Sequence, residues 1–306
     1  MILVTGGTGF IGQVLIRQLT TLGKSVRILL RPSPVSPKLP RGVSVEAAVS
    51  SFKDGRSLRA AMKGVDVIFH LAGSERLSSK ADLTGTDVEG TQLLVRAAAD
   101  SGVERIFFVS HLGADRASAF AVLKAKALAE GFIVNSGLDY TVFRSSVVYG
   151  PGDQFTTSLA KLLRLSPGFF LLPGDGSTLI QPLWIEDLVT CMVLSLEENI
   201  ARNEILSLGG GEYLSFKQVV TTIQETLEIR RKIFYLASPY LRILTLLMEQ
   251  VLSPFPVSIF WLDYLAADRT TALDTLPRMF GVIPARFHQQ IDYLRPKPRS
   301  FFRSKK

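Results

Sequence analysis

A turn built around three glycines lies at the start of the chain. Residues 5–12 read TGGTGFIG and directly follow the apolar run ILV, so Gly6, Gly9 and Gly12 come at steps of three. Glycine accepts the positive φ of a tight turn and leaves no side chain in the way of a pyrophosphate. A helix that begins here points unpaired N–H groups and its dipole at the phosphates. A packing turn without a ligand is the alternative. The pattern favours dinucleotide binding by Gly6, Gly7, Thr8, Gly9, Phe10, Ile11 and Gly12.

The end of the second apolar run indicates which dinucleotide binds. A site for NAD(H) places an Asp or Glu there, where the carboxylate accepts a hydrogen bond from the ribose 2′-hydroxyl. Here residues 26–33 read VRILLRPS and contain no acid. Arg31 can instead hold a 2′-phosphate in a two-pronged grip, unless it is only a solvated strand end. We therefore expect NADP(H) to be preferred, with NAD(H) as the other candidate.

Short apolar or β-branched runs alternate with helical patterns through the first half of the chain. Such alternation predicts an α/β protein with a Rossmann doubly wound parallel sheet. Strands are expected at residues 2–5, 26–30, 43–47, 67–71, 105–110 and 139–144. Helices are expected at residues 12–22, 57–62, 88–101 and 120–136. Each helix is followed by a glycine suited to a left-handed stop, namely Gly23, Gly64, Gly102 and Gly137.

The pattern loosens after about residue 150, where Pro/Gly-rich stretches separate the segments. We expect a dinucleotide-binding domain at residues 1–150 and a smaller α/β lobe, partly interleaved with the sheet, at residues 151–294. One helix of this lobe is well marked. Ser238 can cap it, Pro239 suits its first turn, and one apolar face is formed by Leu241, Leu244, Met248 and Val251.

Composition excludes several classes of protein. The 306 residues are 47% hydrophobic and 20% charged, which is typical of a globular chain and not of a disordered one. The single cysteine, Cys191, lies in the apolar run LVTCMVLSL and excludes a disulfide framework or a Cys-based zinc site. We expect it to be a buried, unreactive side chain.

The net charge of +8 is concentrated in a basic tail. Residues 295–306, RPKPRSFFRSKK, hold six basic residues and no acid. The rest of the chain is therefore nearly neutral, which argues against nucleic-acid binding. The tail is either a solvated end or a contact for an anionic membrane or an acidic partner.

The chain shows no signal-peptide pattern and no apolar run long enough to span a bilayer. Residues 240–262 are strongly apolar, but the longest uncharged piece, residues 250–262, is too short. We expect a cytoplasmic protein that can attach peripherally to a membrane or to a membrane complex.

Several stretches resemble the extended and atypical short-chain dehydrogenase/reductases, which include NAD-dependent epimerases and dehydratases. Besides TGGTGFIG these are GVDVIFHLAG at residues 64–73, SGLDYTVFR at 136–144 and YGPGD at 149–153. The resemblance covers residues 1 to about 230. It is strongest to the branch with NmrA-like proteins and the Rossmann accessory subunit of respiratory complex I. It implies that Leu71, Ala72 and Gly73 line the adenosine side and that Val147 lies near the nicotinamide.

The chain departs from this family at the proton-transfer residues. Family enzymes use a Tyr-x-x-x-Lys pair, and the matching stretch here is FAVLK, with Phe120 in place of the tyrosine. Lys124 remains and is the candidate for the nicotinamide ribose. Leu112 stands where the family has a serine. Phenylalanine has no hydroxyl and cannot exchange a proton with a substrate.

His111 is the candidate for a replacement acid or base. It directly follows the fifth predicted strand, on the side of a parallel sheet where ligands bind. A packed, hydrogen-bonded histidine is the alternative, and we expect that role for His70. Asp187 resembles an acid of the family, but Glu186 and Asp187 also suit the first turn of a helix, so we expect Asp187 to act as a capping residue.

Two functions follow from these residues. The first is an NADP(H)-binding sensor, scaffold or assembly factor without tyrosine-dependent catalysis. The second is an active reductase or epimerase-like oxidoreductase that uses His111 or water as its proton donor. The sequence does not identify the substrate.

Overall fold

A parallel sheet forms the centre of the computed structural model, which describes residues 1–37, 39–74, 81–251 and 259–295. Seven strands pair in the order β11-β6-β5-β4-β1-β2-β3, and every pairing is parallel. The strand order reverses beside β1, where doubly wound sheets bind their ligands. The strands are β1 (Ile2–Thr5), β2 (Val26–Leu30), β3 (Glu46–Val49), β4 (Val67–His70), β5 (Arg105–His111), β6 (Asp139–Ser145) and β11 (Glu204–Leu208).

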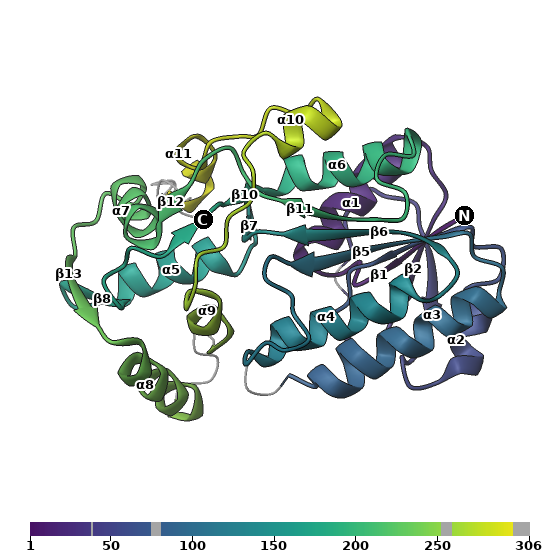
Figure 1. The fold of residues 1–306 in the computed structure, drawn as a ribbon, viewed down its shortest axis with the longest axis horizontal. Helices are drawn as coiled ribbons and strands as arrows, with labels where there is room; N and C mark the ends of the chain where they lie inside the picture. The colour runs from purple at the N-terminus through teal and green to yellow at the C-terminus, as the bar shows by residue number, and fades with distance from the viewer. Residues whose placement is uncertain (38, 75–80, 252–258, 296–306) are drawn as a thin grey trace, which may run out of the picture.

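Helices cover both faces of this sheet (Figure 1). One face carries α1 (Phe10–Thr21) and α6 (Ile185–Glu197), and α10 (Thr275–Phe280) packs on α6. The other carries α2 (Gly55–Ala61), α3 (Gly90–Asp100) and α4 (Ala121–Val134), with the π-helical turn η2 (Leu83–Glu89) leading into α3. Each face buries its own apolar core, and this confirms the doubly wound α/β prediction.

The second lobe packs beyond the carboxyl ends of the strands, at the left of Figure 1. Its helices are α5 (Phe155–Leu165), α7 (Phe216–Thr226), α8 (Ser238–Val251), α9 (Ile259–Tyr264), α11 (Phe287–Gln290) and the 3-10 turn η3 (Ile291–Leu294). Short strands pair as β7 (Val148–Tyr149) with β10 (Leu183–Trp184), β9 (Leu179–Ile180) with β12 (Leu214–Ser215), and β8 (Phe169–Pro173) with β13 (Lys232–Leu236). A separate apolar cluster holds this lobe together.

Local stop signals agree with the sequence prediction. Gly23, Gly64, Gly102 and Gly137 all have φ between 72° and 80°. Cys191 is fully buried, and burial raises the pKa of its thiol to about 12.

Two predicted elements are placed differently. The third strand begins at Glu46 and not at residue 43, because its register on β2 places Glu46 opposite Arg27, and the two side chains form an ion pair. Ser238 lies inside the first turn of α8 and does not cap it. The carbonyl of Ala237 accepts the N–H groups of Tyr240 and Leu241 instead.

The helices of the described residues include none that is long and apolar enough to cross a membrane. The basic tail falls almost wholly on residues 296–306, outside the described part of the chain.

Candidate functional site

The glycine turn between β1 and α1 is held by close backbone packing. Gly6 has a φ of 69°, and a Cβ there would lie 2.6 Å from the carbonyl carbon and oxygen of Leu71. A Cβ on Gly12 would lie 2.4 Å from the Gly6 oxygen. These two glycines therefore let the chain fold back tightly enough to bring the start of α1 beside the end of β4.

The start of α1 is free to receive an anion. Gly9 precedes the helix in an extended conformation, and no side chain caps the helix there. The first helical hydrogen bond runs from Gln13 N–H to the Gly9 carbonyl, so the N–H groups of Phe10, Ile11 and Gly12 have no acceptor within the helix. The Gln13 amide holds the turn itself by donating to the Thr8 carbonyl at 2.9 Å. This cradle fits a pyrophosphate.

The sheet order places the other predicted dinucleotide contacts on both sides of this turn. Arg31 follows β2 and is exposed, while Leu71, Ala72 and Gly73 follow β4 and are half-buried. Since β1 lies between β2 and β4, the turn has Arg31 on one side and residues 71–73 on the other. The backbone N–H groups of Leu71 and Ala72 donate to Thr5 Oγ1, at 3.2 and 3.3 Å.

His70 belongs to a buried hydrogen-bond network beneath the turn. Its Nδ1 lies 2.7 Å from Thr5 Oγ1, and its Nε2 lies 3.0 Å from Thr91 Oγ1. The ring also stacks on Phe108 at 5.4 Å. His70 therefore has the packed, hydrogen-bonded role expected for it, and its contact with Thr5 helps to fix the start of the turn.

The first turn of α4 carries no hydroxyl group. Phe120 occupies the N-cap position, and residues 121–123 are Ala, Val and Leu. Leu112 is buried at the end of β5. Residues 120–123 and Leu112 therefore offer no hydroxyl group for proton transfer.

Lys126, and not Lys124, points into the protein from α4. Lys124 is exposed, whereas Lys126 is buried and forms an ion pair of 3.7 Å with Asp87. Asp87 also accepts hydrogen bonds from the backbone and the hydroxyl of Ser74. The chemistry of the site therefore includes a buried ammonium–carboxylate pair that the sequence interpretation did not identify.

His111 lies in an aromatic and cationic cluster contributed by the second lobe. Its ring centroid is 5.3 Å from that of Phe260 and 6.4 Å from that of Tyr264, both on α9. The Arg269 guanidinium lies 5.7 Å from the centre of the Tyr264 ring and packs against Gly113. Burial raises the pKa of Tyr264 to about 12, so its hydroxyl keeps its proton at neutral pH.

The loop between β7 and α5 is fixed by Asp153. This buried carboxylate accepts N–H groups from Gly150 and Thr156, each at 2.8 Å, and the Tyr293 hydroxyl at 2.9 Å. Burial raises the pKa of Tyr293, and the neighbouring Asp153 charge adds to this effect. Val147, between β6 and β7, is buried, and its carbonyl accepts the N–H of Leu183.

Asp187 does not cap α6, contrary to the sequence prediction. Trp184 occupies the N-cap position with no side-chain hydrogen bond, and Asp187 instead accepts the backbone N–H of Ala285 at 2.8 Å. Burial raises the pKa of the Asp187 carboxyl, with a smaller contribution from Glu186. The residue anchors the segment after α10, a contact that its position in the sequence does not show.

Sequence reasoning missed four residues of the site for two reasons. Lys126 shares the buried face of α4 with Leu123 and Glu130, a helical spacing that could have identified it. Asp87, Tyr264 and Arg269 reach the site only through tertiary packing. No local pattern marks them.

Comparison with known proteins identifies the domain that carries this turn. Residues 6–157 match the family model for NAD(P)H-binding domains. Over 88% of this chain and 70% of the relative, the protein is 26% identical to subunit 9 of the NADH dehydrogenase [ubiquinone] 1 alpha subcomplex of Arabidopsis thaliana. It is 28% identical to sterol demethylase protein B of Methylococcus capsulatus, with 73% of each chain covered.

A solved structure shows the same fold at low identity. The NADPH-dependent quinone oxidoreductase of Escherichia coli in complex with NADPH superimposes with a TM-score of 0.76 at 18% identity, covering 96% of this chain and 99% of the other. The chain thus carries an NAD(P)H-binding domain in its N-terminal half, and its homologues lie in the extended short-chain dehydrogenase/reductase and NAD-dependent epimerase family.

Proposed function

We propose that this protein binds NADP(H) in preference to NAD(H) and uses it as a regulatory or structural ligand. The preference rests on Arg31, an exposed guanidinium that follows β2 beside the glycine turn. A guanidinium can bind a 2′-phosphate with two parallel hydrogen bonds. The sequence after β2 offers no acid for a 2′-hydroxyl.

The absence of tyrosine-dependent turnover rests on the first turn of α4. Phe120, Ala121 and Val122 offer no O–H group there, and Leu112 offers none at the end of β5. The nicotinamide would supply a hydride when bound, but a carbonyl reduction also needs a proton at the substrate oxygen. A protein that keeps the nucleotide cradle and lacks the proton donor fits a sensor, scaffold or assembly factor. The relative from Arabidopsis, named as a subunit of NADH dehydrogenase, supports such a role in a membrane complex.

Nucleotide titrations of the wild type and of Arg31→Ala test this proposal. A ligand at 100 times its dissociation constant adds about 2.7 kcal/mol of stability, so NADPH should raise the melting temperature more than NADH does. Arg31→Ala should remove that difference and leave NADH binding unchanged. An undiminished preference for NADPH in the variant would show that Arg31 does not hold the 2′-phosphate.

A second candidate function is a reductase in which His111 holds the proton. The observation that favours it is the His111–Tyr264–Arg269 cluster at the carboxyl end of β5. In such a reaction His111 would donate its proton to the carbonyl oxygen and regain one from solvent. NADPH oxidation with carbonyl and quinone substrates distinguishes the two functions. Brisk oxidation that His111→Ala abolishes would replace the sensor proposal with this one.

A further inference from the structure

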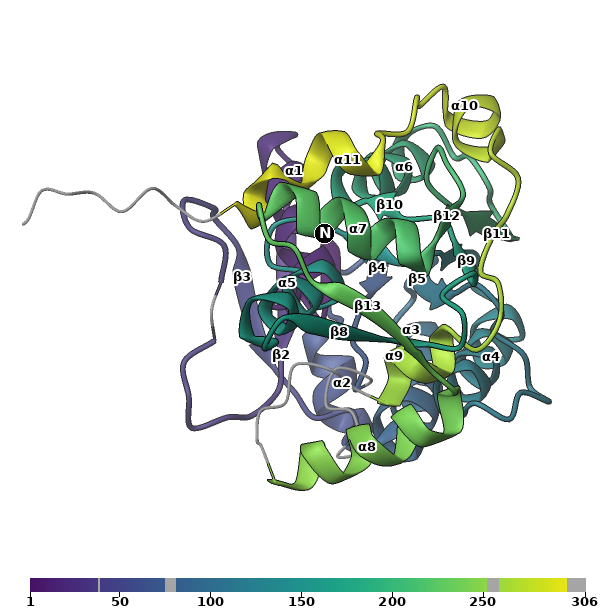
Figure 2. The same ribbon diagram turned by 90° about the vertical axis from the view of Figure 1, so that its left-hand side faces the viewer.

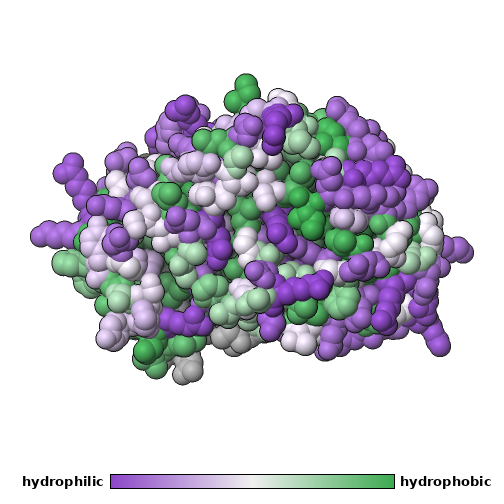
Figure 3. Space-filling model, in the orientation of Figure 1, coloured by the Kyte–Doolittle hydropathy of each residue, from purple (hydrophilic) through white to green (hydrophobic). Residues whose placement is uncertain are grey.

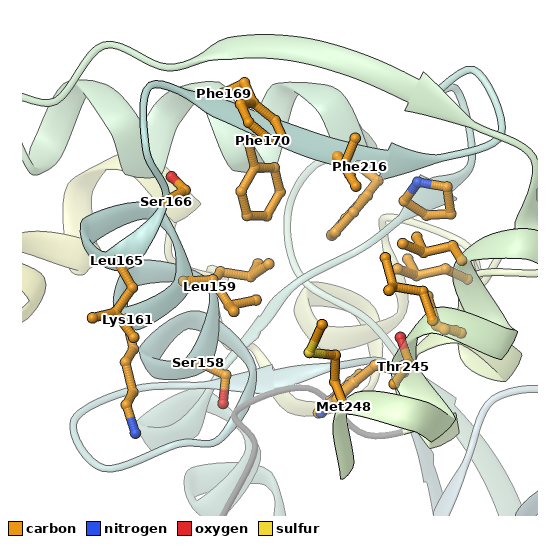
Figure 4. A pocket seen from close by; sticks show the side chains of 18 of the residues that line it. Ser158, Leu159, Lys161, Leu165, Ser166, Phe169, Phe170, Phe216, Thr245 and Met248 are labelled. Atoms are coloured by element: carbon orange, nitrogen blue, oxygen red, sulfur yellow. The ribbon is translucent and has the colours of Figure 1, made fainter. Parts of the chain in front are cut away.

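A large apolar cavity lies in the second lobe, apart from the glycine turn. Its volume is about 720 Å³, within the range of about 300–1,000 Å³ for small-molecule sites. Its walls come from α5, β8, α8 and α9, and their side chains point into a common space (Figure 4). The cavity is partly open to solvent. Exposed apolar surface of this extent marks a binding groove or an interaction site on a soluble protein.

The cavity walls select an apolar ligand. Phe155, Leu159 and Phe170 form one side, and Leu244 and Met248 of α8 form the other. A polar molecule placed among such side chains would lose its hydrogen bonds to water without replacement. A hydrocarbon chain loses none and gains dispersion contacts on every side.

Polar groups gather along α5, at one side of the cavity. Ser158 and Lys161 line it there, and Ser166 follows the same helix. In Figure 4 the Lys161 side chain extends outward from this side, and it is exposed. A ligand with its chain inside the cavity can therefore place an anionic head group near this ammonium.

The helix that closes the cavity is apolar on both sides. Leu241, Leu244 and Met248 face the cavity, as the sequence pattern predicts, while Tyr240 and Ile243 are 67% and 57% exposed. Figure 3 shows hydrophobic side chains at the lower left, where α8 lies in Figure 1. Figure 2 shows β13 running directly into this helix. Arg242, which pairs with Asp263, is the charged exception among the exposed side chains of residues 240–247. An exposed apolar face of this kind marks a surface that protein or lipid covers.

The charges beside this face favour lipid over protein as its cover. On α5, Lys161 and Arg164 are exposed and the helix contains no acid. The segment from the end of α7 to the start of β13 contributes Arg230, Arg231 and Lys232 against a single acid, Glu228. Exposed rings of β8 and β13, Phe169 and Phe234, lie among these cations. Basic side chains beside exposed aromatic and aliphatic groups are the chemistry that binds an anionic bilayer surface.

We propose that this cavity binds the hydrocarbon chain of an anionic membrane lipid, with α8 resting on the bilayer and the head group near Lys161. This binding does not depend on turnover or on the proposed role of NADP(H).

Tryptophan fluorescence can test the proposal directly. The chain has two tryptophans, and Trp261 lines the cavity, whereas Trp184 packs on Tyr149. In a Trp184→Phe background, Trp261 is the only reporter. Bromine atoms quench tryptophan on contact, so the probes are stearic acid brominated near its methyl end and phosphatidylglycerol vesicles with brominated chains. Both probes should quench Trp261, whereas vesicles of brominated phosphatidylcholine should quench it less.

Two phenylalanine substitutions on α8 form a matched pair. Thr245 lines the cavity and is 4% exposed, so Thr245→Phe narrows it, whereas Ile243→Phe alters only the outer side of the same helix. Thr245→Phe should weaken quenching by the free acid at least tenfold, and Ile243→Phe should not. Leu162→Phe narrows the cavity from α5 and replaces Thr245→Phe if that variant does not fold. Circular dichroism and the melting temperature report folding in each case.

Several results would overturn the proposal or a part of it. Absence of quenching by the free acid, or quenching that survives both narrowing substitutions, would show that no chain enters the cavity. If brominated vesicles quench Trp261 equally in Thr245→Phe and Ile243→Phe, α8 contacts the bilayer but no lipid chain enters the cavity. Quenching by the acid but not by vesicles would support the cavity and exclude a membrane source. Lys161→Glu should weaken binding of the acid. An unchanged affinity would show that Lys161 does not contact the head group.

Discussion

Substitution of Gly6 by alanine should lower the free energy of unfolding more than the same substitution at a glycine where a Cβ has free space. Gly6 has a positive φ, which costs an alanine about 1–2 kcal/mol. The added Cβ would also lie 2.6–2.7 Å from the backbone of Leu71 and Ala72, and backbone atoms cannot rotate away as a side chain can. Overpacking of this kind costs about 1–3 kcal/mol. We therefore expect a total loss of about 2–5 kcal/mol from the free energy of unfolding.

Gly23→Ala is the matched control for this experiment. Gly23 has nearly the same φ, 72°, and a Cβ there would meet nothing within 4 Å. The Gly23→Ala variant should lose only the cost of holding alanine at a positive φ, about 1–2 kcal/mol, and should bind NADPH normally. Urea unfolding measures the stabilities, and calorimetry measures NADPH affinity, which should fall about tenfold or more only in Gly6→Ala. Equal losses in the two variants would refute the close approach of the turn to β4.

Three further outcomes follow from buried groups. Arg144→Met removes a two-pronged ion pair to the buried Glu130, with contacts of 3.0 and 2.6 Å. It should cost about 3–5 kcal/mol in urea unfolding, and a second substitution, Glu130→Leu, should partly restore that loss. Because burial raises the pKa of Asp187 above 3.8, the cost of ionising it in the folded state appears as the pH rises through that raised pKa. Asp187→Asn should therefore stabilise the protein at pH 7 and change little near pH 4, and an equal effect at both values would contradict this. The Cys191 thiol should react with a thiol reagent at pH 8 only after unfolding, and rapid labelling of the native protein would show that it is accessible.

The sequence was most informative where local geometry decides the structure. β1 and β2 have the predicted bounds, because each is a short apolar run closed by a glycine or a charged residue. Gly23 and Gly102 stop their helices with positive φ, since nothing but the local backbone determines that conformation. The glycine turn was predictable for the same reason.

Residues that act through tertiary packing were not predictable. The start of β3 depends on the Arg27–Glu46 ion pair, which forms only when two strands align. Tyr264 meets His111 across about 150 residues of chain, because α9 packs over the end of β5. Asp187 looked like a capping residue because its sequence position fits one. Its carboxylate instead bonds a backbone group almost a hundred residues away.

Lipid binding in the second lobe should be coupled to nucleotide binding through the aromatic wall between the two sites. Trp261 lines the cavity and packs on Phe155 at 4.9 Å and on Phe260 at 5.0 Å, and Phe260 lies 5.3 Å from His111 at the end of β5. A chain that fills the cavity therefore presses on rings that pack against His111, at the carboxyl edge of the sheet where we propose that the nucleotide binds. We expect stearic acid to change NADPH affinity by about fivefold or more, and NADPH to change the affinity for stearic acid by the same factor, since coupling free energies are reciprocal. Phe260→Ala should reduce both factors together while leaving each ligand able to bind alone. If NADPH affinity were the same with and without the acid, the aromatic side chains would transmit no coupling, and the two sites would bind independently.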